Sequence, residues 1–281
     1  MPFDINLKGK VAVVTGAGGV LCSIFSEALA AAGARVALLN RTFEKAETVA
    51  ARIREAGGTA VAYAANVLDK ATLTLVHDKV VADLGKCDIL INGAGGNSPV
   101  ATTDKEYFEP GDEADADLRT FFNIEQEGIE QVFNLNFMGA LLSTQVFAVD
   151  MIGRSNCTII NISSMNSYTP LTKIPAYSAA KAGVSNFTQW LAVHFSKVGI
   201  RVNAIAPGFF VTDQNRALLF DGDGNATARS QKILAATPMG RFGLREELLG
   251  TLFYLVCQEA SGFVTGVIIP VDGGFSAYSG V

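Results

Sequence analysis

The sequence predicts one α/β domain with a doubly wound parallel sheet of about seven strands and helices on both faces. Short apolar runs rich in β-branched residues alternate with longer alanine-rich helical patterns along all 281 residues. The runs are apolar at nearly every position, which is typical of parallel strands that are covered on both faces. No linker or change of composition interrupts the alternation, so residues 1–281 are expected to form a single domain.

The expected strands are short and follow one another in order: 11–15, 36–40, 59–64, 88–92, 158–162, 201–206 and 267–271. Helical patterns lie between them: 23–32, 43–56, 73–84, 129–151, 176–197 and 245–256. Residues 132–149 carry no charge, but they include Asn, Ser, Thr and Gln side chains that are unfavourable in a single membrane span. We therefore expect a buried helix there and no membrane partner.

Composition excludes several classes of function. A net charge of −5 disfavours general binding of nucleic acid. The four cysteines lack any C-x-x-C spacing, which is neither a disulfide framework nor a zinc pattern and fits a reducing, cytoplasmic location. The N-terminus carries charges before any apolar run, unlike a signal peptide. With only two histidines, we expect no metal site.

Two long polar segments interrupt the alternation. One, near 95–123, is rich in Asp and Glu, and the other, near 212–241, contains the turn-rich Asp-Gly-Asp-Gly-Asn at 221–225. Long segments at the carboxyl ends of parallel strands tend to cover the ligand crevice. The first is either a solvated insertion or part of this cover, and the second is expected to be a substrate lid.

A glycine cluster predicts a nucleotide site and a Rossmann-like fold. Thr15, Gly16, Gly18 and Gly19 follow the first strand and precede a helix, where backbone N–H groups can approach a pyrophosphate. Asn40-Arg41 ends the second strand, where the adenosine ribose is expected. A neutral residue followed by arginine favours a 2′-phosphate, although Arg41 could equally be a solvated loop residue. The choice between NAD and NADP stays open.

Tyr177 and Lys181 form an i, i+4 pair on one face of an expected helix. An ammonium about 4 Å from a phenolate stabilises it by up to about 4 kcal/mol at an effective dielectric of about 20, which would lower the pKa of the phenol. Such a tyrosine could exchange a proton with an alcohol near neutral pH. Ser164 follows the strand 158–162, and its hydroxyl could hold the substrate oxygen beside Tyr177.

Together with Asn136, these residues resemble the short-chain dehydrogenase/reductase family in order and spacing along nearly the whole chain. The resemblance implies an NAD(P)(H)-dependent oxidoreductase that acts on a secondary alcohol or ketone. It assigns acid/base catalysis to Tyr177, support of that tyrosine to Lys181, substrate positioning to Ser164 and a proton relay to Asn136. Tyr177 and Lys181 would also contact the cofactor. Further cofactor contacts implied are Leu21, Asn66, Val67, Asn92, Gly93, Ala94, Gly95, Pro207, Gly208 and Thr212.

The chain departs from the family pattern in its glycine motif. The family usually has Thr-Gly-x-x-x-Gly-x-Gly, but Val20 and Cys22 replace the last two glycines here. Gly19 could take over the close approach to the phosphates. The apolar helices 132–149 and 176–197 resemble those through which the family forms homotetramers, although burial within one chain would produce the same pattern.

A finer resemblance links segments 95–103, 164–167, 170–175, 215–219 and 273–280 to a sugar-acid subgroup that interconverts D-mannonate and D-fructuronate. A hexonate requires a cation for its carboxylate and polar partners for its hydroxyls. We expect Lys173 or Arg216 to bind the carboxylate, and Asn97 and Asn166 to bind hydroxyls. The alternatives are a gluconate-type dehydrogenase, a 3-oxoacyl reductase and, more remotely, a non-catalytic nucleotide sensor or a serine hydrolase.

Overall fold

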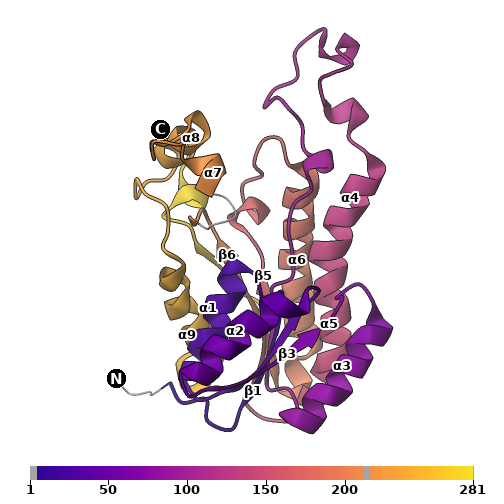
Figure 1. The fold of residues 1–281 in the computed structure, drawn as a ribbon, viewed down its shortest axis with the longest axis vertical. Coiled ribbons are helices and arrows are strands. Elements are labelled where there is room, and N and C mark those ends of the chain that lie inside the picture. Colours follow the sequence, from indigo (N-terminus) through magenta and orange to yellow (C-terminus); the bar gives the residue numbers. More distant parts are fainter. Residues whose placement is uncertain (1–4, 212–215, 281) are drawn as a thin grey trace.

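A computed structural model describes residues 5–211 and 216–280 and contains one seven-stranded parallel sheet (Figure 1). The strand order is β3-β2-β1-β4-β5-β6-β7. Strands β2 and β3 are added on one side of β1, and the chain then crosses to the other side of β1, where β4 to β7 follow. This arrangement confirms the predicted doubly wound fold. The strands are β1 (Val11–Thr15), β2 (Arg35–Asn40), β3 (Thr59–Ala64), β4 (Ile89–Asn92), β5 (Cys157–Ile162), β6 (Ile200–Pro207) and β7 (Ile268–Val271).

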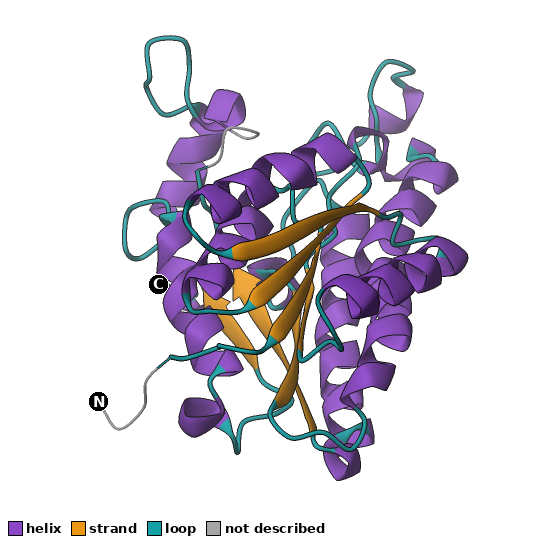
Figure 2. Cartoon of the chain, turned by 60° about the horizontal axis from the view of Figure 1, so that its bottom comes forward, coloured by secondary structure: helices purple, strands orange, loops and turns teal. Residues whose placement is uncertain are grey.

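Helices cover both faces of the sheet (Figure 2). One core cluster joins the sheet to α1 (Val20–Ala31), α2 (Phe43–Glu55) and α9 (Leu249–Val256) through buried residues such as Phe25, Val49 and Leu252. The other joins the opposite face to α3 (Lys70–Asp83), α5 (Gly139–Phe147) and α6 (Pro175–His194) through Leu73, Phe147 and Leu191. Burial on both faces explains why the strands lack the alternation of apolar and polar residues seen in half-exposed strands.

Most helices match the expected patterns, with small differences at their ends. Their bounds are α1 (Val20–Ala31), α2 (Phe43–Glu55), α3 (Lys70–Asp83), α4 (Gln126–Phe133), α5 (Gly139–Phe147), α6 (Pro175–His194), α7 (Arg216–Leu219), α8 (Ala228–Ala235), α9 (Leu249–Val256) and α10 (Gln258–Ser261). The short helices α7, α8 and α10 were not expected, because each is too short to show a clear helical period. The expected helix 129–151 is interrupted by a π-helical turn, η4 (Asn134–Met138).

The helical segment Gln126–Met151 is long and apolar enough to cross a membrane by length and composition, with a mean hydropathy of 1.4. Half of this stretch is buried inside the fold, where α5 packs against β4 and α3. A core helix passes the same test of composition, so this single helix is weak support for a membrane span.

Two segments rise above the carboxyl edge of the sheet (Figure 1). Between β4 and α4 the chain forms three short 3₁₀ turns: Pro99–Ala101, Asp112–Ala114 and Phe121–Asn123. Between β6 and α9 it forms α7 and α8, while residues 212–215 of the predicted lid lie outside the described residues. Both segments therefore begin where a ligand crevice is expected in this type of sheet.

Candidate active site

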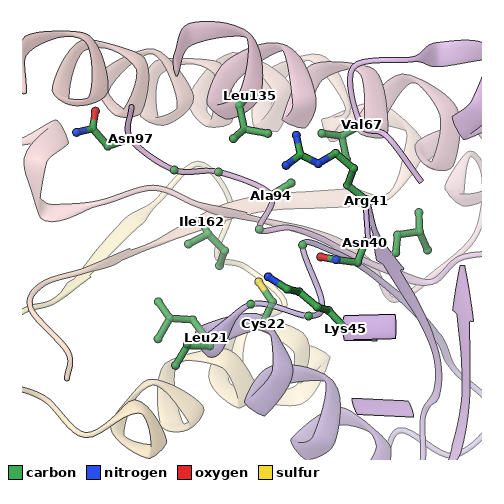
Figure 3. A pocket seen from close by; sticks show the side chains of 18 of the residues that line it. Leu21, Cys22, Asn40, Arg41, Lys45, Val67, Ala94, Asn97, Leu135 and Ile162 are labelled. Atoms are coloured by element: carbon green, nitrogen blue, oxygen red, sulfur yellow. The ribbon is translucent and has the colours of Figure 1, made fainter. Parts of the chain in front are cut away.

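A cavity of about 810 Å³ opens at the carboxyl edge of the sheet, where the strand order reverses between β1 and β4 (Figure 3). Its lining comes from the β1–α1 turn, the ends of β2 and β3, the loop after β4, the end of β5, the start of α6 and the turn after β6. This convergence follows from the topology, because parallel strands deliver all their carboxyl ends to one edge.

The β1–α1 turn leaves its backbone uncovered. Gly16 has φ +66°, and a Cβ there would lie 2.9 Å from the backbone of Ala94. Gly19 is the N-cap of α1, which begins at Val20 rather than near 23 as the sequence analysis expected. The N-terminus of α1 therefore lies against the cavity, and its free N–H groups and dipole favour a bound phosphate. These features fit a dinucleotide pyrophosphate.

Cys22 fits into this site because residue 93 is glycine. A Cβ on Gly93 would overlap the Cys22 sulfur, so the side chain at position 22 uses the space that the glycine leaves free. Cys22 is only 4% exposed, and burial raises the pKa of its thiol to about 12. The Cys22 side chain is therefore an uncharged part of the cavity wall. The family motif usually has glycine at position 22, and Gly93 provides the space that the larger cysteine side chain needs.

The end of the cavity beside β2 carries two cations. Arg41, in the β2–α2 connection, and Lys45, in the first turn of α2, both line it (Figure 3). The Asn40 side chain donates from Nδ2 to the Thr42 carbonyl at 2.8 Å, so it is engaged within its own loop. Lys45 was not singled out from the sequence, although its place in the first turn of α2, five residues after Asn40, could have indicated it.

Ser164, Tyr177 and Lys181 meet in the same cavity. Tyr177 and Lys181 lie one turn apart on α6, and the ammonium is 5.7 Å from the centre of the Tyr177 ring. Ser164 follows β5, and its hydroxyl forms a hydrogen bond with the Tyr177 phenol. Lys181 is 4% exposed, and its Nζ donates to the Ile162 carbonyl at 2.7 Å.

The protonation of this group differs from the sequence-based prediction. Burial raises the pKa of Tyr177, and the hydrogen bond from Ser164 opposes this shift without reversing it. Burial also lowers the pKa of Lys181 to about 8, so the charged form of the lysine is itself destabilised. The prediction that the pKa of Tyr177 lies below its ordinary value is therefore wrong, because it did not include the desolvation of the buried phenol.

Asn136 lies beside this group in the π-helical turn η4 and is almost fully buried. Its side-chain amide pairs with the backbone of Gly96, donating to the carbonyl at 2.7 Å and accepting from the N–H at 3.2 Å. A Cβ on Gly95 would lie 2.6 Å from Asn136 Oδ1 and 3.2 Å from Lys181 Nζ, so both side chains approach the same glycine. The π-helical turn therefore places the Asn136 side chain beside Gly95, on the side of the cavity where Lys181 also lies.

Most residues predicted to contact the cofactor line the cavity: Gly16, Gly18, Gly19, Leu21, Asn40, Arg41, Asn66, Val67, Gly93, Ala94, Gly95, Tyr177, Lys181, Pro207 and Gly208. Thr15 and Asn92 are not part of the lining. The Thr15 hydroxyl accepts from the N–H groups of Gly93 and Ala94 at 3.1 and 3.2 Å, which joins the two loops. Asn92 Nδ2 donates to Asn161 and Thr144 inside the core. Thr212 lies outside the described residues.

Of the predicted substrate residues, only Asn97 lines this cavity. Asn166 is buried, and its backbone N–H donates to Ser164 Oγ at 3.3 Å. Lys173 donates from Nζ to the Asp104 carbonyl at 2.7 Å, at the base of the insertion. The Arg216 guanidinium lies 5.6 Å from the centre of the Phe220 ring.

Nothing in the sequence indicated other residues of the cavity wall, among them Gln131 on α4 and Leu135 on η4, although Leu135 is next to Asn136 in the chain. No local pattern marks them, because they reach the site only through the packing of α4 beside α6.

We predict that Gly93→Ala destabilises the protein by about 1–3 kcal/mol, because the new methyl group overlaps the Cys22 sulfur. Cys22→Ala in the Gly93→Ala background should restore most of the loss. Thermal unfolding measures both changes. Gly96→Ala is the matched control, since its Cβ would meet only Leu135 at 3.9 Å. Equal losses in Gly93→Ala and Gly96→Ala would refute the proposed compensation.

Comparisons with known proteins agree with this geometry. The family model described as short chain dehydrogenase matches residues 10–221. An uncharacterized oxidoreductase of Haemophilus influenzae is 59% identical over 276 residues, covering 98% of this chain and 96% of its own length. A crystal structure from the same species, of a protein proposed to be a D-mannonate oxidoreductase and containing NAD, has a TM-score of 0.95 at 59% identity, with 98% of each chain covered.

A more distant structure is the gluconate 5-dehydrogenase of Burkholderia cenocepacia with NADP and tartrate, with a TM-score of 0.80 at 32% identity and 98% of each chain covered. The glycine turn, the helix N-terminus and the cavity at the strand reversal fit the dinucleotides that these two structures hold. The chain therefore belongs to the short-chain dehydrogenase family of NAD(P)-dependent oxidoreductases.

Proposed function

We propose that the protein interconverts D-mannonate and D-fructuronate by hydride transfer between the substrate carbon and a nicotinamide. The observation that carries the proposal is the meeting of Ser164, Tyr177 and Lys181 in a dinucleotide cavity that begins at the base of the polar insertion. Asn97 also lines this cavity and offers an amide group to the substrate. The high similarity to a protein proposed to be a D-mannonate oxidoreductase supports the choice of sugar acid.

In this proposal Tyr177 exchanges the proton of the substrate oxygen, and the Ser164 hydroxyl holds that oxygen next to the phenol. Burial raises the pKa of Tyr177, so the phenol is protonated at neutral pH but is a weaker proton donor than an exposed tyrosine. Positive charge close to the phenol would offset this shift and bring its pKa closer to neutral pH. Lys181 would bind the nicotinamide ribose and bring positive charge close to the phenol. Asn136 would support a proton relay near Lys181.

Gly16, Gly19 and the N-terminus of α1 would hold the pyrophosphate, and Arg41 and Lys45 would lie at the adenosine ribose. When bound, the nicotinamide supplies the carbon that accepts or donates hydride and, in its oxidised form, a positive charge. Two cations at the ribose end favour a 2′-phosphate. We therefore propose that NADP is accepted as well as NAD.

A gluconate-type dehydrogenase is the second candidate function, because the gluconate 5-dehydrogenase structure shares the fold over nearly the full chain. The two candidates oxidise the same carbon, C5, and differ in the configuration of the sugar acid at C2.

A substrate panel tests the proposal. D-Mannonate, D-gluconate and their keto acids are assayed at 340 nm with NAD(H) and NADP(H), with an acyl ketone as a chemically different control. D-Mannonate and D-fructuronate should give the highest kcat/KM, with measurable rates for both dinucleotides. Turnover of the acyl ketone without turnover of any hexonate would overturn the proposed substrate class.

We also propose that the protein works as a cytoplasmic homotetramer that assembles through α5 and α6. Large apolar side chains are exposed on and near these helices, including Trp190 at 56%, Val193 at 77% and Val149 at 56%. The four cysteines are free and buried, which suits a reducing compartment. Light scattering should give four times the chain mass of 29.6 kDa, and a monomer would refute the assembly.

A further inference from the structure

We propose that Lys173, Arg229 and Lys232 form a cationic cluster that recruits the substrate carboxylate, and that Glu106 occupies this cluster when no substrate is present. The inference rests on the proposed function, because it requires a substrate with a carboxylate. It differs from the sequence-based expectation in naming two residues of α8 and an internal carboxylate that competes with the substrate.

Three segments that are distant in sequence contribute to the cluster. Lys232 of α8 donates from Nζ to Glu106 Oε1 in the insertion at 2.9 Å. Lys173 precedes α6 and donates from Nζ to the carbonyl of Asp104, two residues before Glu106. Arg229 lies one turn before Lys232 on α8, and its charge also acts on Glu106. The insertion and the lid segment therefore meet at Glu106.

The cluster lies on the same side of the sheet as the candidate active site. Its three segments follow β4, β5 and β6, and the residues directly after β4 and β5 and at the end of β6 line the cavity (Figure 1). The insertion passes from the cavity wall at Asn97 to Glu106, and Lys173 lies four residues before Tyr177. The cluster itself lies outside the cavity lining, so it would act on a carboxylate that approaches between these segments.

Glu106 faces these cations, whereas other acidic side chains of the insertion are engaged elsewhere. The Asp104 carboxylate accepts from the Arg119 backbone N–H at 2.7 Å. Glu109 and Asp112 both pair with Lys105, at 2.9 and 2.7 Å. Lys232, Lys173 and Arg229 all lower the pKa of Glu106, so this carboxylate is ionised at neutral pH.

The pair between Glu106 and Lys232 is easily exchanged. The Lys232 side chain is 69% exposed, and ion pairs between exposed groups contribute little because water and salt screen them. A substrate carboxylate can therefore replace Glu106 without a large loss of stability. Charges at an entrance also raise the rate at which an oppositely charged ligand arrives, and this effect weakens as salt increases.

The competing interpretation is that the pair only fastens the insertion to α8. Under that interpretation, removing either partner has the same effect, because either change breaks the same link. Under the recruitment proposal the two changes have opposite effects. Loss of Glu106 removes a competitor and lowers KM, whereas loss of Lys232 removes an attractive charge and raises KM.

The experiment measures kcat and KM for D-mannonate with wild type, Glu106→Gln, Lys232→Ala and Arg229→Ala/Lys232→Ala at low and high ionic strength. We expect KM to fall about threefold in Glu106→Gln and to rise about tenfold in the double variant, with kcat unchanged in both. The double variant should also show a weaker dependence of kcat/KM on salt. D-Mannonamide, the uncharged amide of the same acid, should show none of these changes.

Glu27→Gln is the matched control, because it breaks a comparable exposed pair with Arg52 between α1 and α2 and should leave KM unchanged. Thermal unfolding of each variant verifies that it folds. A rise of KM in Glu106→Gln, or an unchanged KM in the double variant, would overturn the recruitment proposal while D-mannonate remains a substrate. Failure of the wild type to turn over D-mannonate with either dinucleotide would overturn the proposed function and this inference with it.

Discussion

The chemistry proposed for this protein depends on a buried ammonium group. Lys181 lies in the wall of the dinucleotide cavity, where its Nζ donates to the Ile162 carbonyl at the end of β5. Removing such a charge from water is unfavourable unless polar groups compensate, and the lowered pKa of the lysine reflects this desolvation. Burial also raises the pKa of the Tyr177 phenol and so favours its neutral form, which shows how strongly this part of the cavity disfavours charge.

The topology explains why these groups meet. Parallel strands place Thr15, Asn92, Ile162 and Pro207 at one edge. Gly16 and Gly93 lie so close to neighbouring residues there that a side chain at either position would clash. Cys22 shows how the family motif can vary without closing the site, because Gly93 provides the space that its sulfur requires. The polar segments above this edge meet where Lys232 of α8 pairs with Glu106 of the insertion.

The sequence predicted the sheet well, because continuous apolar runs identify strands that are buried on both faces. It also predicted the residues of the site that belong to compact motifs, such as Gly16, Tyr177 and Lys181. It could not predict the direction in which the pKa of Tyr177 shifts, since desolvation depends on the complete packing around α6. Likewise, nothing local connects Glu106 with Lys232 across 126 residues, and only the fold brings them together.

The central claim is that the Tyr177 hydroxyl transfers the proton, and substituting that residue tests it most directly. Tyr177→Phe should lower kcat for D-fructuronate reduction by about 10²–10⁴ while the dinucleotide still binds, as measured by calorimetry. Tyr168→Phe is the matched control, since this exposed phenol donates to the Ile268 carbonyl and should be dispensable for turnover. A Tyr177→Phe variant with the kcat of the wild type would contradict the account.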